Sequence, residues 1–252
     1  MRSIFTGSAL VFVLALFFSC SAVQSNFSNP KNIEKAVTQL TESGIPLQAD
    51  PQGNVRWIEA RNGEFKDTSM RYLPRLPGLE WLEISNSNLS DNGLKYLKNC
   101  TGIKRLYIHD MDLTGEELKW ISNLNQLEAL ALQNTQIDGA FLKHLSAVNT
   151  LRVLNLSGNN ISDEDMAQIA RFKNLEVLSL ANTKISGTGI KSLEGMARLN
   201  EFNIENCGVF DSDLTSFLTM PNLRIVYATG CELSDYAIGN IIARFPSLAI
   251  FL

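Results

Sequence analysis

The chain has 252 residues, of which 45% are apolar, so it is long enough to bury a sizeable hydrophobic core. Its formal net charge is −4 and its pI is about 5.3. This acidic balance disfavours nucleic-acid binding, because phosphate contacts need a basic stripe, and the basic residues look scattered along the sequence as on an ordinary solvated surface.

The N-terminal stretch is typical of an exported protein. Ala9 to Phe18 form an unbroken apolar run that is too short to span a bilayer comfortably, and small residues follow it. We predict a signal peptide over residues 1–20 and a polar tether over residues 21–30. The sequence FFSC that ends at Cys20 is similar to a bacterial lipobox, so we expect lipidation of Cys20 and anchoring in the cell envelope. The alternative is ordinary cleavage after Ala22, which would leave a periplasmic or secreted protein.

Residues 31–54 are predicted to form an N-terminal cap. Gly44 suits the end of a helix, residues 45–49 are predicted to be extended, and residues 50–54 are rich in turn formers before a strand that begins at Val55. This pattern predicts a helix and a hairpin strand that shield the edge and core of the first repeat. The apolar residues with helical spacing are Ile33, Ala36, Val37 and Leu40.

From residue 55 onward, one pattern recurs with a constant 24-residue period. Apolar residues alternate in its first half, as in a half-buried strand, and recur at helical spacing in its second half. One such unit cannot bury its apolar face alone, so residues 55–252 are predicted to stack as eight repeats with a partial C-terminal rung. The first places of the repeats are Val55, Leu79, Ile103, Leu127, Leu151, Leu175, Leu199 and Leu223, with a partial start at Leu248 after one extra residue.

The consensus LxxLxLxxT/NxIS/TD, followed by a short helix, resembles a leucine-rich repeat of the ribonuclease-inhibitor-like, cysteine-containing type. It is also similar to exported repeat arrays of planctomycete-type bacteria, in which a short helix and the sequence DPQGNV precede the first strand. The resemblance implies an α/β solenoid with a curved parallel sheet inside, helices outside and a non-catalytic binding role. Because no F-box-like helical segment stands before the repeats, we expect no ubiquitin-ligase adaptor role.

Several polar residues in the repeats could be mistaken for catalytic or cross-linking residues, but structural roles explain them better. Asp163, Glu164 and Asp165 begin a predicted helix, where carboxylates cap free N–H groups and favour the helix dipole. Cys207 and Cys231 occupy the ninth place of adjacent repeats, about 4.8 Å apart by strand spacing, which is within disulfide range. We favour two buried thiols there, with a disulfide as the alternative.

The remaining cysteine of the repeats and the two histidines do not predict a metal site. Cys100 occupies an apolar place of the repeat and is predicted to fill the core. No CxxC pair is present, and the only histidines are His109 and His144. We therefore predict neither zinc nor any cofactor.

The third, fifth and seventh places of each strand are expected to project from the concave face. Large aromatic and charged residues gather there in the first three repeats, whereas the middle repeats carry small residues. Trp, Tyr and Arg are the residues that most often anchor protein interfaces. The predicted partner-binding residues are Trp57, Glu59, Arg61, Trp81, Glu83, Arg105, Tyr107 and His109.

Trp57 and Trp81 should stand on neighbouring strands, close enough to stack. The alternative is that they pack on the N-terminal cap or on each other without binding anything.

Three functions follow from this organisation. The favoured one is a non-enzymatic module that binds an unidentified protein or cell-envelope ligand. The second is a structural envelope protein that associates through its ends, for example as an end-to-end homodimer. The third is a hydrolase built on His109 beside Ser85 and Asp110, which is disfavoured because no Gly-rich elbow or oxyanion loop is visible.

Overall fold

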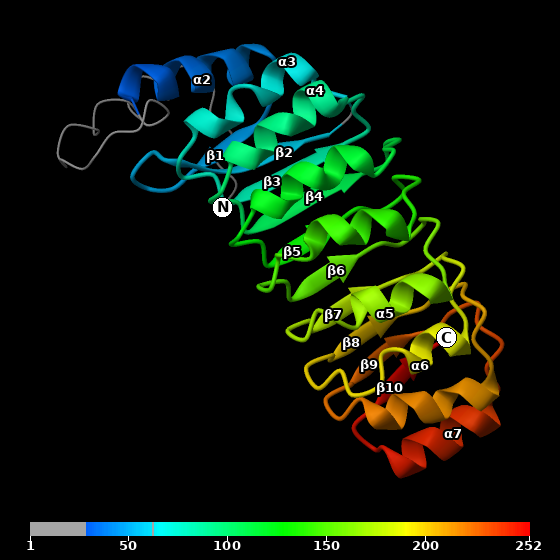
Figure 1. Cartoon of the computed structure of the whole chain (residues 1–252). Coiled ribbons are helices and arrows are strands. Elements are labelled where there is room, and N and C mark those ends of the chain that lie inside the picture. Colours follow the sequence, from blue (N-terminus) through cyan, green and yellow to red (C-terminus); the bar gives the residue numbers. More distant parts are fainter. Residues whose placement is uncertain (1–28, 62) are drawn as a thin grey trace.

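The computed structural model describes residues 29–61 and 63–252 and consists of one curved sheet with helices along one side (Figure 1). The predicted signal peptide, the lipidation site Cys20 and residues 21–28 of the predicted tether lie outside the described residues. Within the described ranges, no helix is long and apolar enough to cross a membrane.

The strands of the described chain form a single ten-stranded sheet in sequence order. The first two strands pair antiparallel, and each later strand pairs parallel with the one before it. The strands are β1 (Leu47–Ala49), β2 (Val55–Ala60), β3 (Trp81–Ser85), β4 (Arg105–His109), β5 (Ala129–Ala131), β6 (Val153–Asn155), β7 (Val177–Ser179), β8 (Glu201–Asn203), β9 (Ile225–Tyr227) and β10 (Ala249–Phe251).

Short helices return the chain from the end of one strand to the start of the next. Because each repeat is short, it leaves room for only a few helical turns, and several of these turns are 3-10 helices, written η. Helix α2 (Pro30–Glu42) precedes the first strand. The connecting helices are α3 (Asp67–Met70), η1 (Leu73–Arg75), α4 (Asp91–Leu94), η2 (Lys95–Asn99), η3 (Glu116–Asn123), η4 (Gly139–Leu145), η5 (Asp163–Asp165), α5 (Met166–Ile169), α6 (Gly187–Lys191), η6 (Asp211–Thr219) and α7 (Asp235–Arg244).

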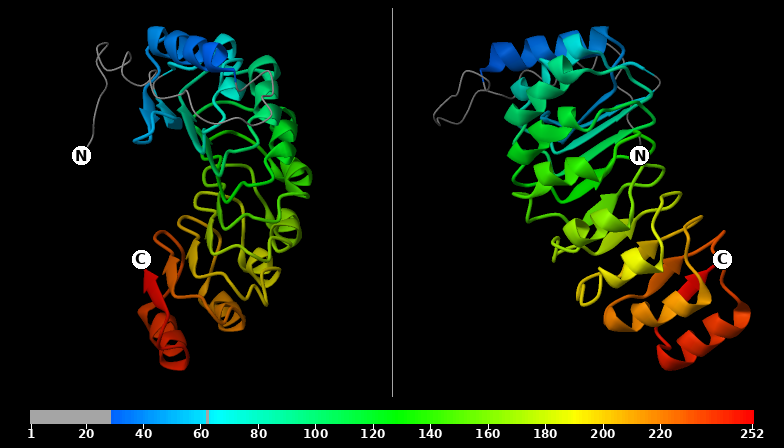
Figure 2. Two further views of the ribbon diagram at one scale, coloured as in Figure 1. Left: turned by 90° about the vertical axis from the view of Figure 1, so that its left-hand side faces the viewer. Right: turned by 45° about the vertical axis from the view of Figure 1, so that its right-hand side comes forward.

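The molecule curves with the sheet on the inner side and the helices on the outer side (Figure 2). Parallel strands pack about 4.8 Å apart, whereas a helix with its side chains is about 10 Å wide, so the helical side has to fan out. The α/β solenoid predicted from the sequence, with a parallel sheet inside and helices outside, is therefore confirmed.

The core lies between the sheet and the helices and runs the whole length of the solenoid. The fourth place of every full repeat is completely buried, and burial of each such side chain contributes roughly 1.5–3 kcal/mol. These residues, all 0% exposed, are Ile58, Leu82, Leu106, Leu130, Leu154, Leu178, Phe202 and Val226.

The turns after β3 to β9 use a left-handed backbone at the eighth place of the repeat. Asn, Asp and Gly tolerate this conformation better than other residues, which explains why only these types occur there. The described eighth places, all with positive φ, are Asn86, Asp110, Asn134, Gly158, Asn182, Asn206 and Gly230.

The acidic residues at the helix starts are caps, as predicted, but not all of them cap their own helix. Asp165 accepts a hydrogen bond from the Ser162 N–H at 2.9 Å within its own repeat. Asp163 instead accepts from both the N–H (2.7 Å) and the hydroxyl (2.6 Å) of Ser186 in the next repeat. Asp163 therefore joins two neighbouring repeats, whereas Asp165 caps the start of its own helix. Equivalent links join Asp67 to Ser90 and Asp211 to Ser234.

The cysteines of the described chain are free thiols. Cys207 Sγ donates to the carbonyl of Leu180 at 3.1 Å, and Cys231 Sγ donates to the carbonyl of Ile204 at 3.1 Å. The ninth-place thiols thus bond to the loop backbone of the preceding repeat and not to each other. Cys100 is buried in the core, and its burial raises the pKa of its thiol to about 12.

The two ends of the solenoid are finished differently. At the N-terminal end, α2 covers the core and β1 pairs with the outer edge of β2. The turn between β1 and β2 is held by Asp50, which accepts from the Asn54 N–H at 2.9 Å and the Arg56 Nε at 2.8 Å. At the C-terminal end, β10 is paired with β9, and Phe251 is 50% exposed.

The register of the last strand differs from the prediction by one residue. Leu248 is buried as a first-place residue should be, yet Ala249, and not Ile250, pairs with Ile225. The α7 side of the last repeat has one residue more than other repeats, but one residue fewer lies between Leu248 and the strand, so Ala249 still follows Ile225 by 24 residues. As a result, Phe251 occupies a fifth place beside Tyr227 on the concave face.

Candidate protein-binding surface

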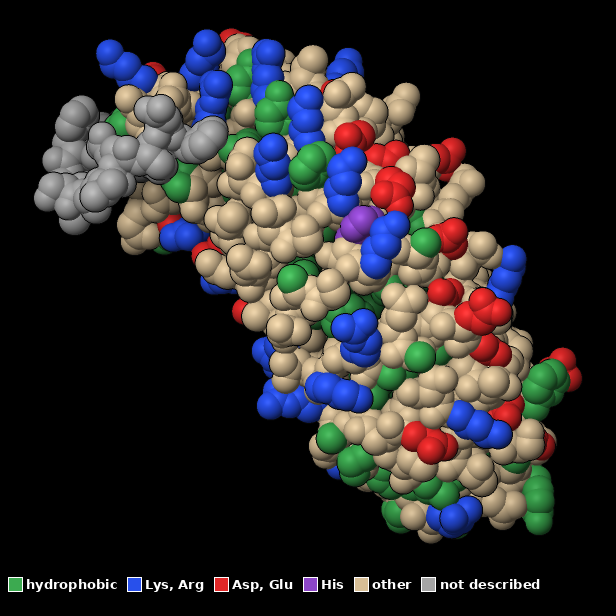
Figure 3. All heavy atoms as spheres, in the orientation of Figure 1, with side chains coloured by type: hydrophobic (Ala, Val, Ile, Leu, Met, Phe, Trp, Pro, Cys, Tyr) green, Lys and Arg blue, Asp and Glu red, His purple; other side chains and the backbone are tan. Residues whose placement is uncertain are grey.

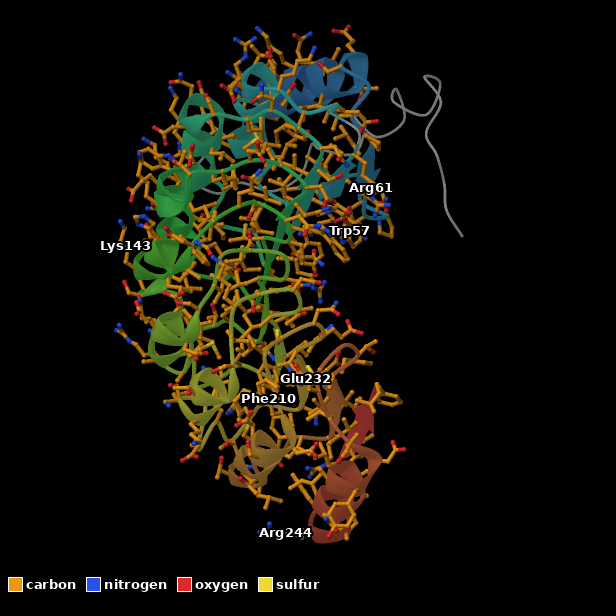
Figure 4. All side chains as sticks on the ribbon, turned by 90° about the vertical axis from the view of Figure 1, so that its right-hand side faces the viewer. Trp57, Arg61, Lys143, Phe210, Glu232 and Arg244 are labelled. Carbon is orange, nitrogen blue, oxygen red and sulfur yellow. The ribbon has the colours of Figure 1, made fainter. Side chains whose placement is uncertain are left out.

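The predicted binding residues lie on the concave face of the first three parallel strands, and together they are called the N-terminal concave cluster. Third-place residues pair directly across the strands: Trp57 with Trp81, and Trp81 with Arg105. Figure 4 shows Trp57 and Arg61 on the concave side of the arc, opposite Lys143 on the helical side. The register therefore brings all eight predicted residues onto adjacent strands or the turns directly after them.

The aromatic part of the cluster is centred on Trp81. Its ring packs edge-to-face against Tyr107, with ring centres 5.3 Å apart and an angle of 81° between the planes. The guanidinium of Arg105 lies 5.5 Å from the centre of the Trp81 ring. Both geometries are favourable for a ring with a negative face and a positive edge. Trp57 is a strand partner of Trp81, as predicted, but the ring that packs against Trp81 is that of Tyr107.

Trp57 stands on the open surface next to the β1–β2 hairpin. Its side chain is 37% exposed, although its backbone is paired on both sides, with Gln48 and with Trp81. A tryptophan that only served to hold the cap in place would be buried beneath it. This exposure leaves a large apolar ring available for contact.

The ionic part of the cluster is centred on a buried carboxylate. Glu83 is 8% exposed, and its Oε1 atom lies 3.0 Å from Arg61 Nη2 and 3.4 Å from His109 Nε2. Arg61 also contacts Glu59 at 2.6 Å. A buried carboxylate is tolerated when it is paired in this way, and the pairing fixes the orientation of its neighbours. The network therefore gives the cluster a defined shape before any ligand arrives.

The same contacts argue against the hydrolase hypothesis. His109 Nδ1 lies 2.8 Å from Asp110 Oδ2, as a catalytic histidine would need, but its Nε2 faces Glu83. Ser85 is buried, and its hydroxyl accepts a hydrogen bond from Asn86 at 3.4 Å. A serine nucleophile has to contact the histidine that takes its proton.

Two titratable side chains of the cluster have shifted pKa values. Hydrogen bonds from Asn134 and then from His109 lower the pKa of Asp110, so the carboxylate stays ionised. Burial raises the pKa of the Tyr107 hydroxyl, which keeps this side chain neutral. In the part of the chain that the structure describes, no group of three or more His, Cys, Asp and Glu side chains could hold a metal ion. The cluster therefore presents aromatic rings beside charged side chains.

A second aromatic pair on the concave face was missed from the sequence. Tyr227 and Phe251 are stacked at the C-terminal end, with ring centres 5.4 Å apart and planes at 23°. The predicted register placed Phe251 at a core position, so its exposure could not be anticipated. The periodic signal that could have found it is that Phe251 follows Tyr227 by one full repeat length.

Comparison with known proteins supports the repeat assignment. The family described as Leucine Rich repeats (2 copies) matches residues 149–195. Among curated protein sequences, none matches this chain.

Solved structures share the fold. Internalin C2 (inlC2) from Listeria monocytogenes is 22% identical, with a TM-score of 0.60 over 86% of this chain and 91% of that one. Internalin inlF from the same bacterium is 19% identical, with a TM-score of 0.53 over 72% of this chain and 56% of that one. TLR13, crystallised in complex with ssRNA13, is 22% identical, with a TM-score of 0.57 over 78% of this chain and 29% of that one.

The aligned region therefore spans only part of inlF and of TLR13, and identities this low show a common fold alone. The finer resemblance to cysteine-containing, planctomycete-type arrays remains a prediction. The 24-residue register, the family match and the shared fold together identify the chain as a leucine-rich repeat protein.

Proposed function

We propose that this protein is an exported, non-catalytic binding module that holds a protein or cell-envelope ligand against the N-terminal concave cluster. The leucine-rich repeat fold is typical of protein–protein interaction modules, which supports the general role. The single observation that carries the location is the group formed by the half-buried rings of Trp81 and Tyr107 and the exposed Arg105, which stands beside the ion network of the buried Glu83.

The cluster has the chemistry of an interface anchor. Trp57, Trp81 and Tyr107 offer large rings with few rotatable bonds, and Arg105 adds a charge that makes no salt bridge within the described residues. Because Glu83 already fixes Arg61 and His109, ordering these side chains on binding costs little entropy. Residues of these types account for most of the binding energy in many interfaces.

The test is affinity capture from the native envelope, followed by mass spectrometry. The full chain is compared with the double variant Trp81→Ala/Arg105→Ala and with a control, Ser179→Ala/Glu201→Ala, on the concave face of later repeats. We expect the first variant to lose the captured partner by about 100-fold in affinity or more, since anchor residues are each worth about 2 kcal/mol. The control should retain it.

Melting curves separate binding from folding. Unchanged capture by Trp81→Ala/Arg105→Ala together with a lowered melting temperature would reject the proposal in favour of a packing role for the rings. Loss of capture by the control alone would move the binding surface toward the C-terminal half.

Export and membrane anchoring are parts of the same proposal and rest on the apolar run and on Cys20. Lipidation would place the module at a membrane through its N-terminus, and several acyl chains anchor more firmly than one. The mass of the mature N-terminus decides between the two routes. A lipid adduct on Cys20 supports anchoring, and an unmodified terminus after Ala22 supports a soluble exported form.

Self-association through the ends is a second candidate, favoured by the exposed Phe251 (50%) and Leu252 (54%) at the last described strand. An end-to-end homodimer would cover these side chains and the free edge of β10. Light scattering at high protein concentration tests it: a dimer that Phe251→Ser dissociates supports the candidate, and a monomer rejects it.

A further inference from the structure

The helical face of the first four repeats carries a recurring pair, a cation at the seventeenth place followed by an aromatic or imidazole ring at the eighteenth. The pairs are Arg71–Tyr72, Lys95–Tyr96, Lys119–Trp120 and Lys143–His144. The next four repeats have Ala167–Gln168, Lys191–Ser192, Thr215–Ser216 and Gly239–Asn240 at these places. The helical face therefore changes character halfway along the solenoid.

The rings support the cations that lie over them. Arg71 and Arg75 lie 4.8 Å and 5.5 Å from the centre of the Tyr72 ring. Lys98 of the second repeat and Lys119 of the third lie 5.2 Å and 4.9 Å from the Trp120 ring. Each cation is thereby held on the outer surface by attraction to a ring face.

Four cations of this face have no carboxylate partner within ion-pair distance among residues 29–61 and 63–252: Arg71, Arg75, Lys95 and Lys98. We call them the convex basic patch. The cations next to it are neutralised, because Lys119 pairs with Asp91 at 3.2 Å and Lys143 pairs with Glu116 at 2.7 Å.

In Figure 3, Lys and Arg side chains gather over the end of the molecule where α2, α3 and α4 lie. A protein of net charge −4 thus carries a concentrated positive surface, and the scattered appearance of its basic residues in the sequence is misleading. The two pairs of cations, Arg71 with Arg75 and Lys95 with Lys98, stand about one repeat apart in the chain, so that the stacking of the repeats brings the pairs together.

We propose that the convex basic patch docks on an anionic lipid bilayer. Its cations come from adjacent repeats on an outward-curving face, so they match a broad anionic surface and not a peptide held in a groove. Single-stranded nucleic acid needs open rings on which bases stack. Here Tyr72 is 7% exposed and lies beneath two guanidinium groups. Polybasic surfaces next to membranes are attracted to anionic headgroups by about 1 kcal/mol per Lys or Arg.

The N-terminal helix α2 adjoins the convex basic patch. Tyr72 Oη donates to Gln39 of α2 at 3.2 Å, so the helix that continues from the preceding residues lies beside the patch. The nine residue-to-residue steps from Cys20 to Asn29 span at most roughly 30 Å. This second argument rests on the proposed lipidation of Cys20. A bilayer held within that distance would be close to the end of the solenoid that carries the patch, and docking on the patch would leave the concave cluster facing away from the bilayer.

Vesicle partitioning of the full chain tests the docking. Vesicles of phosphatidylcholine alone are compared with vesicles that contain about one third phosphatidylglycerol, at about 0.05 M and about 0.5 M salt. Wild type should prefer the anionic vesicles at low salt and lose that preference at high salt. Lys95→Gln/Lys98→Gln should weaken the preference by roughly 30-fold, since each lost charge is worth about five-fold.

The matched control is Lys173→Gln/Lys191→Gln, which removes two exposed lysines of later repeats and should stay within about two-fold of wild type. All variants keep the N-terminal apolar run, so its contribution to binding is the same in each. Equal losses in both variants, no preference of wild type for anionic vesicles, or tighter binding to a single-stranded oligonucleotide than to anionic vesicles would overturn the proposal.

The partner assay keeps the two proposals separate. Partner capture by Lys95→Gln/Lys98→Gln should equal that of wild type. The variant Trp81→Ala/Arg105→Ala should keep its preference for anionic vesicles, because it alters the opposite face.

Discussion

The early and the later repeats of this solenoid share one core and differ almost entirely in their surfaces. The fourth-place residues Leu82 and Leu178 are both completely buried, and the strands that carry them keep the same 24-residue register. Their outward places are unlike each other, because aromatic and charged side chains gather on both faces of the first three repeats, whereas the repeats that start at Leu151, Leu175 and Leu199 have mostly uncharged residues and no aromatic ring at the same places. In a repeat fold, the shared places specify the architecture, and the places that break the repetition locate the surfaces available for binding.

The two ends differ in a second way that concerns stability. At the N-terminal end, α2 and β1 cover the first repeat, and the eleventh-place Phe65 is completely buried. At the C-terminal end, the equivalent Leu233 and the helix residue Ile238 are only partly buried. The same places thus contribute less burial where nothing in the described chain packs over them.

The largest expected effect is on the rate at which cysteine thiols react. This rate should be lower near the covered N-terminal end than near the less covered C-terminal end. Burial raises the pKa of Cys100 to about 12, so near pH 8 it should react with an alkylating reagent about a thousand-fold more slowly than a thiol in the unfolded chain. Cys231, partly buried near the C-terminal end, should react faster than Cys100. Peptide mass spectrometry over time measures both, and Cys100 reacting first would contradict the difference between the ends.

The next largest effect is the loss of stability when a side chain of the shared core is shortened. Leu82→Ala and Leu178→Ala should each lower the free energy of unfolding by about 3 kcal/mol, because each removes a completely buried side chain and leaves a cavity. Urea denaturation measures the two values. A cost near 3 kcal/mol in one repeat and below about 1 kcal/mol in the other would show that the two halves do not share one core.

The turn between β1 and β2 should make a smaller, pH-dependent contribution to the free energy of unfolding. Burial alone would raise the pKa of Asp50, but hydrogen bonds from Arg56 and Asn54 lower it from 3.8 to about 2. Because the folded pKa lies below the unfolded one, the contribution is complete above about pH 4 and is lost as the pH falls toward 2. We expect a loss on the order of 1–2 kcal/mol in wild type.

Asp50→Asn is the control for that titration. It should be less stable at neutral pH and should lack this part of the acid dependence. Equal acid dependence of the two proteins between pH 4 and pH 2 would contradict the role of Asp50.

The smallest change in the free energy of unfolding is expected at the C-terminal end, where β10 is the last strand of the sheet. Phe251→Ser should lower the free energy of unfolding by less than about 1 kcal/mol, because the ring is half exposed and contacts mainly Tyr227. Thermal melting measures it. A loss as large as that of a core leucine would mean that the last strand is covered and not open.

Much of this organisation could be predicted from the sequence because repetition encodes it directly. The third-place pairing of Trp57, Trp81 and Arg105 follows from their spacing of one repeat length and needed no coordinates. What could not be predicted depends on rotamers and distances. The sequence does not indicate that the Trp81 ring packs against Tyr107, or that one Glu83 oxygen is shared by Arg61 and His109.

Two further features were hidden for different reasons. Phe251 was misplaced because the apolar Leu248 fits the first place of a shifted repeat, whereas the strand pairing keeps the plain 24-residue spacing from Tyr227 to Phe251. The convex basic patch was overlooked because Arg71 and Lys95 stand a whole repeat apart in the chain, and an outward place gives no periodic apolar signal.

Site-specific photocross-linking tests the central claim, that partners bind at the N-terminal end of the concave face. A photoreactive amino acid replaces either Arg105 or Glu201, which are matched third-place residues of β4 and β8, in the full chain expressed in its native envelope. The account predicts a partner adduct from position 105 and little or none from position 201. Adducts from position 201 without any from position 105 would contradict it.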